Sequence, residues 1–342
     1  MADLDVVVVG CGIVGASVAF ALGQRNRDVT IVEKAHHSGH ETSSRNSGVI
    51  HAGLYYPPGS LKAELCRLGR DMIYDFCANY GVPCEKTGKF IVANGPEEEA
   101  YLSWLLENAK PTPLYRVDQG PSGIRASAAL FSPESGVVDQ HALIDALLLQ
   151  SGATVLLDQT VEGLAAISDG AEVRVSGDIT TAKTVINCAG LQAATFVPGY
   201  QHAYAKGSYF SVRHPALKTL TSLVYPAIPK TSPSLGIHLV RTFSGEWYLG
   251  PDFQWVDSID YGVDPTRAGE FARAAERFLP GLSEDDLQPG YAGIRPKLSK
   301  TENRDFLFLQ EGGLIHCLGI DSPGLTAAMA IGEYVADLLI RD

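Results

Sequence analysis

The N-terminal fifty residues of this 342-residue chain constrain its fold more than any other segment does. Four consecutive valines, Val6–Val9, are followed at once by Gly10-Cys11-Gly12-Ile13-Val14-Gly15. A stretch of small and apolar residues comes next, and then a second apolar run that ends at Glu33. The order strand, glycine turn, helix, strand and acid is the dinucleotide-binding fingerprint in its required context. The pattern therefore predicts an α/β protein whose first βαβ unit holds a dinucleotide.

Each residue type in this unit has a physical task. Gly10 permits a tight turn, Gly12 lets a pyrophosphate approach the backbone, and Gly15 lets the helix pack closely on the sheet. The first helical turn offers free N–H groups and a partial positive charge to phosphates. Glu33 can accept hydrogen bonds from ribose hydroxyls, and together with the valines it argues against a glycine-rich turn of an unrelated protein. The residues predicted to contact the dinucleotide here are Gly10, Gly12, Ile13, Val14, Gly15, Glu33 and Lys34.

Composition excludes several classes of function. A hydrophobic content of 45% provides for an ample core, and a net charge of −12 argues against nucleic acid as a partner and against docking on anionic membranes. The six cysteines are scattered without a metal-binding spacing, which predicts reduced thiols in a cytoplasmic protein and no metal site. We interpret His36, His37 and His40 as a solvated loop.

A window over residues 6–23 carries no charge and resembles a membrane span. The glycines of the turn and Ser17 interrupt it, and the dinucleotide fingerprint accounts for each of them. No cationic leader or arginine-rich transit segment precedes the first strand. The sequence therefore predicts no integral membrane segment and a cytoplasmic location, while peripheral contact with a membrane stays open.

The rest of the chain mixes helical and strand patterns. Residues 61–80 show helical periodicity, and Gly81 is expected to end that helix. Asp139 is the expected N-cap of a helix over 140–150. Residues 205–250 alternate apolar and polar positions, which predicts antiparallel strands with one face on a site. Further expected helices cover 97–109, 264–279 and the tail that opens at 319–326, and further expected strands cover 89–93, 154–157, 172–175, 184–187 and 304–318.

The nucleotide-binding domain is expected to be discontinuous. The final helix opens beside glycine, as the first helix does, which suggests a second contact with the cofactor. We therefore predict that the chain returns to this domain after an inserted α+β substrate domain built on an antiparallel sheet. The predicted ranges are 1–85, 140–200 and 300–342 for the nucleotide-binding domain, and 86–139 and 201–299 for the substrate domain.

Blocks from one end of the chain to the other resemble flavoproteins of the glycine-oxidase and D-amino-acid-oxidase type. They include VVVGCGIVGASVA, RNSGVIHAG, TGKFIVA, INCAGLQA, KGSYF, GYAGIRPKL and GIDSPGLTAAMAIGEYV. Within that superfamily they are most similar to the L-2-hydroxyglutarate dehydrogenase/oxidase group. The resemblance implies a Rossmann-type domain of the glutathione-reductase kind, bound FAD, and two-electron oxidation of a small 2-hydroxy acid.

The chain departs from the pattern of this group in three places. Its segment 192–205 is shorter than in longer members, Ala194 replaces a usual acid, and Val240 follows His238-Leu239 where threonine is usual. These changes leave the expected flavin site intact and bear on the identity of the substrate.

The polar run Thr42–Gly48 is expected to hold the pyrophosphate and the ribityl chain, and the alternative is a solvated loop. Val161 is expected to contact the adenine through its backbone, on the resemblance alone. The remaining predicted FAD contacts are Thr42, Ser43, Ser44, Arg45, Asn46, Ser47, Gly48, His51, Val161, Ala189, Gly190, Gly293, Arg295, Ser322, Pro323, Gly324, Leu325 and Thr326.

Arg295 is the expected anchor of a substrate carboxylate, because a carboxylate prefers a planar, permanently charged partner. Lys206 is expected to hold a second carboxylate or to polarise the hydroxyl, and its alternative is an exposed lysine. Tyr55 and Tyr209 are expected to wall the substrate pocket.

Oxidation of an alcohol also requires a base for the hydroxyl proton, and a neutral histidine suits that task. His51 follows the loop expected to wrap the flavin, and His238 lies on a strand expected to face it. One of them is predicted to be the base, while a purely structural role, or a covalent flavin bond at His51, is the alternative.

The sequence thus predicts an FAD-dependent dehydrogenase or oxidase of a small 2-hydroxy acid, most similar to those acting on L-2-hydroxyglutarate. The first alternative is an amine or amino-acid oxidase on the same fold, and the second is a non-catalytic flavoprotein subunit. A protein that binds only NAD would leave the SSRNSG and GIDSPG blocks without a function. Oxygen, a quinone and an electron-transfer protein all remain open as the electron acceptor.

Overall fold

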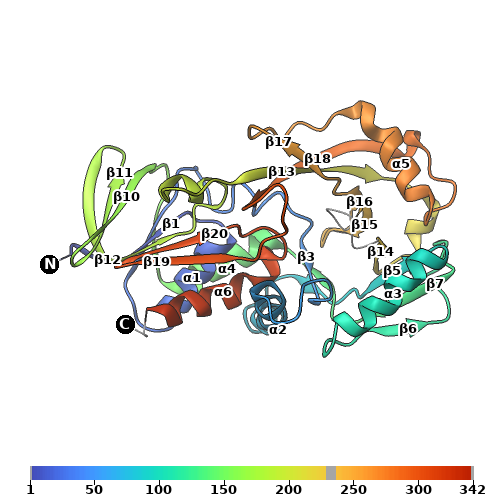
Figure 1. The fold of residues 1–342 in the computed structure, drawn as a ribbon, viewed down its shortest axis with the longest axis horizontal. Helices are drawn as coiled ribbons and strands as arrows, with labels where there is room; N and C mark the ends of the chain where they lie inside the picture. Colours follow the sequence, from blue (N-terminus) through green and yellow to red (C-terminus); the bar gives the residue numbers. More distant parts are fainter. Residues whose placement is uncertain (1, 229–235, 340–342) are drawn as a thin grey trace.

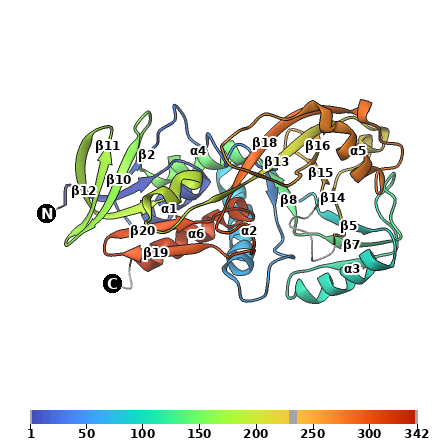
Figure 2. The same cartoon turned by 45° about the horizontal axis from the view of Figure 1, so that its top comes forward.

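The computed structural model describes residues 2–228 and 236–339 as two lobes (Figure 1). The first lobe carries β1, β12 and β20 with helices α1, α4 and α6, and the second carries the strands around β14 with α3 and α5. Figure 2 shows the long strands β13 and β18 side by side, reaching from the second lobe toward the first. This arrangement confirms the predicted α/β fold class.

An eight-stranded mixed sheet forms the centre of the first lobe. The four-valine run lies in β1, which pairs in parallel with β12 on one side and β2 on the other. On the side of β12 away from β1, its first half pairs antiparallel with β11 and its last residues pair in parallel with β20. The strands of this sheet are β1 (Leu4–Val9), β2 (Val29–Val32), β9 (Thr154–Leu156), β10 (Val161–Ile167), β11 (Gly170–Val175), β12 (Asp178–Asn187), β19 (Leu307–Glu311) and β20 (Leu314–Leu318).

The helices of the first lobe pack closely on one another and on this sheet. Small residues permit the approach: a Cβ added at Gly332 would lie 2.4 Å from the Ser17 carbonyl oxygen, and one at Gly69 would lie 2.2 Å from that of Thr326. The buried core combines valines of β1 with apolar residues of α1 and α6. The helices are α1 (Ile13–Gly23), α2 (Leu61–Tyr80), α4 (Gln140–Ser151) and α6 (Gly324–Leu338).

The predicted ends of two helices are confirmed. Ser60 caps α2 by accepting a hydrogen bond from the Ala63 backbone N–H, and Gly81 ends the helix in the left-handed region at φ +69°. Asp139 caps α4 by accepting from the backbone N–H groups of its first turn at 3.0 Å. These signals are local in the sequence, which is why they predict the boundaries well.

A nine-stranded sheet forms the second lobe, with α3 (Pro96–Asn108) and α5 (Ala268–Glu276) packed on it. The alternating region predicted over 205–250 is antiparallel except at β14, which pairs antiparallel with β15 but parallel with β5. Its strands are β5 (Lys89–Ala93), β6 (Tyr115–Val117), β7 (Ala128–Ser132), β13 (Ala203–Val212), β14 (Leu223–Pro226), β15 (His238–Arg241), β16 (Trp247–Gly250), β17 (Gln254–Val256) and β18 (Leu287–Lys297).

A third, small sheet joins segments from both predicted domains. In it β8 (Gly136–Val138) pairs with β3 (Val49–Ile50) and β4 (Cys84–Glu85), so a strand from the range expected for the substrate domain pairs with strands of the first range. The α-helix predicted over 264–279 is shorter than expected, because a 3-10 turn, Pro265–Arg267, precedes α5. The other 3-10 segments are Gly190–Phe196, Pro215–Lys218 and Glu284–Asp286.

The uncharged window over residues 6–23 is divided between β1, the glycine turn and α1. Among the helices of residues 2–228 and 236–339, none is long and apolar enough to cross a membrane.

Candidate active site

A cavity of about 1060 Å³ lies between the two large sheets. It is lined at one end by the glycine turn after β1 and at the other by strands β13, β14, β15 and β18. Its volume is at the upper end of the range for small-molecule and cofactor sites, roughly 300–1,000 Å³. The cavity therefore has room for a dinucleotide together with a small substrate.

The glycine turn has the geometry that its sequence predicts. Gly10 adopts φ +99°, which disfavours residues with a Cβ. A Cβ on Gly15 would lie 2.0 Å from the Gly10 carbonyl oxygen, so α1 packs against the turn only because Gly15 has none. At Gly12 an added Cβ would meet the Ser43 hydroxyl at 2.9 Å, and the same hydroxyl accepts a hydrogen bond from the Ile13 N–H at 2.9 Å. The backbone of this turn is not covered by side chains, so a pyrophosphate can approach it closely.

Glu33 lies at the end of β2 and lines the cavity. Its carboxylate accepts hydrogen bonds from the backbone N–H groups of Cys11, at 2.7 Å, and Ala35, at 2.9 Å. A carboxylate has about four lone-pair sites, so capacity for ribose hydroxyls remains. The neighbouring Lys34 pairs with Glu41 at 2.9 Å.

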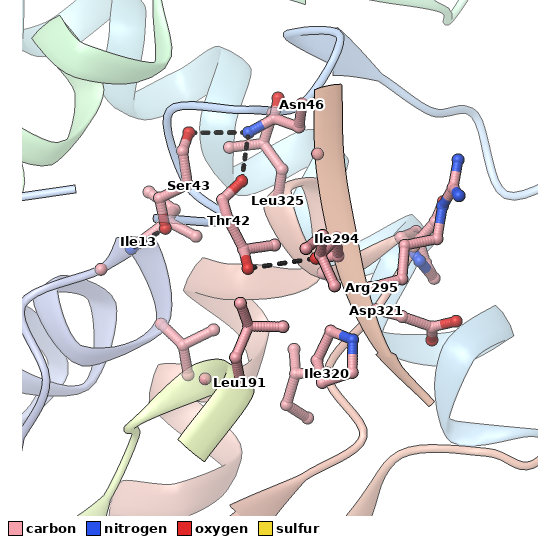
Figure 3. A pocket seen from close by; sticks show the side chains of 18 of the residues that line it. Ile13, Thr42, Ser43, Asn46, Leu191, Ile294, Arg295, Ile320, Asp321 and Leu325 are labelled. Atoms are coloured by element: carbon pink, nitrogen blue, oxygen red, sulfur yellow. Dashed lines mark hydrogen bonds between the residues drawn. The ribbon is translucent and has the colours of Figure 1, made fainter. Parts of the chain in front are cut away.

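The polar run Thr42–Gly48 is a loop folded by its own hydrogen bonds and anchored to β18 (Figure 3). The Asn46 amide donates to the Ser43 carbonyl at 2.7 Å, and its oxygen accepts from the Gly48 N–H at 2.8 Å. The Thr42 hydroxyl donates to the Ile294 carbonyl of β18 at 3.3 Å. The loop is therefore an ordered part of the cavity wall and not a solvated segment.

Glycine is required where this loop meets β18. A Cβ on Gly293 would lie 2.0 Å from the Arg45 carbonyl oxygen. The Tyr291 hydroxyl donates to the Asn46 carbonyl at 2.8 Å, and the Arg45 guanidinium lies 4.1 Å from the centre of the Tyr261 ring. These contacts hold the first and second lobes together along one edge of the cavity.

Most residues predicted to contact the cofactor line this cavity. Gly15, Ser44 and Gly48 lie behind the lining, and so does Thr326, whose buried hydroxyl accepts from the His51 N–H at 3.0 Å and donates to the Val49 carbonyl at 3.2 Å. The predicted residues in the lining are Gly10, Gly12, Ile13, Val14, Glu33, Lys34, Thr42, Ser43, Arg45, Asn46, Ser47, His51, Val161, Ala189, Gly190, Gly293, Arg295, Ser322, Pro323, Gly324 and Leu325.

The loop before α6 contributes a buried charged cluster that the sequence analysis missed. Asp321 pairs with Lys62 at 2.7 Å and with Lys297 at 2.8 Å, and all three residues line the cavity. The Asp321 side chain is only 5% exposed, so the pairing is largely removed from water. Two lysines against one aspartate leave a net positive charge beside the predicted cofactor contacts Ser322 and Pro323.

Arg295 lies on β18, and Figure 3 shows it across the cavity from Ile13, the first residue of α1 after the glycine turn. Its guanidinium rests against the backbone of Gly207, where an added Cβ would lie 2.9 Å from both terminal nitrogens. Its buried Nη1 atom has no hydrogen-bond partner among the described residues. Beside it Tyr209 lines the cavity and stacks on Tyr291 with ring centres 4.4 Å apart.

Both predicted histidines reach this end of the cavity. The His238 Nδ1 atom lies 2.8 Å from the Gly236 carbonyl, which can only accept, so Nδ1 carries the proton and Nε2 keeps its lone pair. Burial lowers the pKa of His238 well below its usual value, and burial together with Lys89 lowers the pKa of His51 to about 3. Both imidazoles are therefore neutral at neutral pH.

The structure does not bring Lys206 into this cavity, which corrects the prediction made for it. Successive side chains of a strand point to opposite faces, so Gly207 and Tyr209 face the large cavity while Lys206 faces the other side of β13. There Lys206 pairs with Asp260 at 2.7 Å and lines a separate cavity of about 300 Å³. The sequence shows the alternation, but it does not show which face of the strand meets the site.

A different lysine, absent from our prediction, lies beside the histidines. Lys89 begins β5 and is completely buried, and its ammonium lies 4.7 Å from the ring centre of Tyr55 and 4.5 Å from that of Tyr225. Tyr225 also stacks on His238 with ring centres 3.8 Å apart. Burial lowers the pKa of Lys89 to about 7. A lysine at the head of an otherwise apolar strand was the sequence signal that could have identified it.

The buried Lys89 leads to a prediction about stability. Its pKa in the folded protein lies below the usual value of 10.5, so the unfolded chain binds more protons between about pH 7 and 10.5. The cost of burying it is largest below pH 7 and declines as the pH rises. Lys89→Met should therefore raise the free energy of unfolding by about 2–4 kcal/mol at low pH, and by less at alkaline pH.

Chemical unfolding at pH 6 and at pH 9 measures this effect. Lys62→Met is the matched control, because it removes one partner of a buried ion pair and should destabilise the protein instead. Equal loss of stability in both variants would show that Lys89 supports the fold.

Comparison with known proteins agrees with this architecture. The model of the FAD dependent oxidoreductase family, DAO, matches residues 5–338. The mitochondrial L-2-hydroxyglutarate dehydrogenase of Arabidopsis thaliana is 35% identical, over 99% of this chain and 84% of its own, and that of Escherichia coli is 28% identical, over 97% and 92%. The L-α-glycerophosphate oxidase of Mycoplasma pneumoniae, solved with FAD bound, superimposes with a TM-score of 0.88 at 24% identity, over 98% of this chain and 94% of its own.

The predicted resemblance and the predicted cofactor are thereby confirmed, and the bare backbone of the glycine turn, together with the volume of the cavity, fits FAD. A family model that covers nearly the whole chain shows that this protein belongs to the FAD dependent oxidoreductase (DAO) family.

Proposed function

We propose that this protein oxidises L-2-hydroxyglutarate to 2-oxoglutarate. The observation that carries the proposal is the Arg295 guanidinium, which reaches the cavity without an acidic partner among the described residues and lies near two neutral histidines. Relatives from a plant and a bacterium that are named for this activity support the same substrate. When bound, FAD supplies a hydride acceptor at its N5 atom.

Arg295 binds the carboxylate next to the carbon that is oxidised. A guanidinium can donate two parallel hydrogen bonds to a carboxylate, which fixes the orientation of the acid as well as its position. Because the guanidinium already rests against Gly207 with its Nη1 atom buried, the substrate exchanges its own hydration for a prepared partner. This preorganisation reduces the cost of binding.

The two histidines handle the hydroxyl group. A neutral imidazole can accept the hydroxyl proton as the hydride leaves the adjacent carbon, and His238 presents a free Nε2 lone pair for that purpose. His51 is positioned through its backbone by Thr326. We assign proton acceptance and hydroxyl orientation to this pair. Replacing either one with glutamine tests the assignment, because the loss of a general base typically slows the reaction by about 10²–10⁴-fold.

The substrate is tested by anaerobic visible spectroscopy of the FAD-loaded protein. L-2-Hydroxyglutarate should bleach the flavin absorbance, whereas its D-enantiomer and glycine should leave it unchanged. His51→Gln and His238→Gln should slow the bleaching without releasing FAD. Bleaching by an amine that persists in both variants would instead establish an amine oxidase, because a deprotonated amine needs no strong base. A flavin that no acid or amine reduces would point to a non-catalytic subunit.

Gly207→Ala tests the role of Arg295 without removing its charge. The added Cβ would lie 2.9 Å from the guanidinium and 2.7 Å from Pro251, so the flexible arginine must move away from its place. We expect KM for the hydroxy acid to rise about 10-fold or more, since a charged hydrogen bond is worth about 1.5–3 kcal/mol. Gly163→Ala is the matched control, because its Cβ would have its nearest contact, Arg174, at an ordinary 3.8 Å. An unchanged KM in Gly207→Ala would contradict the role of Arg295.

The electron acceptor is identified by mixing the reduced protein with each candidate. Oxygen, a soluble quinone and an electron-transfer flavoprotein are the candidates, and the rate at which the flavin absorbance returns ranks them.

A further inference from the structure

Unpartnered polar atoms gather at the end of the large cavity that holds the histidines. Buried polar groups are normally paired, because leaving one unpaired costs about 1–3 kcal/mol. In this region the buried atoms without a hydrogen-bond partner among the described residues are His51 Nδ1, the Tyr55 hydroxyl, Lys89 Nζ, the Tyr225 hydroxyl and Arg295 Nη1. Such a set indicates a ligand with several acceptor atoms.

Two of these groups are cations, and they occupy different places. Arg295 lies over Gly207 on β13, whereas Lys89 lies beside the rings of Tyr55 and Tyr225. No ion pair within the described residues neutralises either cation. In contrast, Lys62 and Lys297 at the loop before α6 share Asp321. The histidine end of the cavity therefore has one cation in its lining, Arg295, and a second one, Lys89, buried beside the lining.

We propose that Tyr55, Tyr225 and Lys89 form a second carboxylate subsite, which selects dicarboxylic over monocarboxylic hydroxy acids. Both tyrosines line the cavity, and their buried hydroxyls have no partner among the described residues, which leaves them available as donors to the distal carboxylate. Lys89 lies buried beside both rings, outside the cavity lining, and its positive charge acts on the carboxylate across this short distance. This inference rests on the proposed function and names the feature of the substrate that the site distinguishes.

The second subsite also lies next to the residues that handle the hydroxyl group. Tyr225 stacks on His238 at 3.8 Å, so the second subsite adjoins the histidine that handles the hydroxyl. A carboxylate at Arg295 and another at the tyrosines would leave the reacting carbon between them, beside the imidazoles. Lys206, which pairs with Asp260 in another cavity, does not contribute.

Calorimetric titration of the FAD-loaded protein with glutarate and with butyrate tests the subsite without turnover. The unaltered protein should bind glutarate at least 10-fold more tightly than butyrate. Lys89→Gln should remove most of that preference, while Tyr55→Phe and Tyr225→Phe, which delete only a hydroxyl, should each weaken glutarate binding about 3-fold to 10-fold. Binding of butyrate should change little in all three variants.

Lys206→Gln is the matched control, because it changes a buried lysine outside the cavity and should preserve the preference for glutarate. Loss of the preference in Lys206→Gln but not in Lys89→Gln would overturn the proposal, and so would equal affinities in the unaltered protein. A third outcome is that the preference for glutarate depends on Lys89 although L-2-hydroxyglutarate does not reduce the flavin. That result would support the second carboxylate subsite and contradict the proposed substrate.

The pH dependence gives an independent measurement. Burial lowers the pKa of Lys89 to about 7, so its charge is lost as the pH rises. Affinity for glutarate should fall about 10-fold per pH unit above pH 7, and affinity for butyrate should not. Burial lowers the pKa of each facing histidine and raises that of each facing tyrosine and cysteine, so none of them titrates in this range. The titratable groups that face Lys89 are His51, Tyr55, Cys66, Tyr225 and His238.

Discussion

The contact between the loop Thr42–Gly48 and strand β18 is the constraint on which the site depends. There the Arg45 carbonyl approaches so closely that Gly293 has no room for a Cβ, and the Thr42 hydroxyl bonds to the carbonyl of Ile294. The same loop contacts the glycine turn through the hydrogen bond from the Ile13 N–H to Ser43, and the residue of β18 after Ile294 is Arg295. One backbone contact therefore sets the distance between the place where a pyrophosphate fits and the place where a carboxylate fits.

Burial has two opposite effects at the histidine end of the cavity, and both favour the proposed reaction. It lowers the pKa of His51 and His238, so that each is neutral and able to accept a proton. The same low-dielectric surroundings strengthen the attraction between Arg295 and an anion. A more exposed site would keep neither advantage: its histidines would be partly protonated near pH 6.5, and its arginine would be screened by water.

Local patterns in the sequence predicted the parts of the fold that local physics determines. The glycine turn, the capped helix α2 and the N-cap Asp139 lie where expected, because each depends on residues a few positions apart. Long-range pairing was not predictable in the same way. The parallel pairing of β14 with β5 joins segments more than 100 residues apart, and it brings Lys89 close to Tyr225. The sequence therefore placed Arg295 and the two histidines in the lining of the cavity, but it expected Lys206 there and did not single out Lys89.

Lys206 and Lys89 differ in whether their charge has a counter-ion, and this difference decides which of them can attract an anionic ligand. Lys206 has an acidic partner, so its charge is already compensated and it gains little from a ligand. Among the described residues no carboxylate pairs with Lys89, and the aromatic rings of Tyr55 and Tyr225 beside it stabilise a cation less than a carboxylate does. A buried charge without a counter-ion is costly to fold, and an anionic ligand that pairs with it returns that free energy as affinity. For this reason an uncompensated buried cation is a stronger indication of an anion site than a lysine in a matching sequence block.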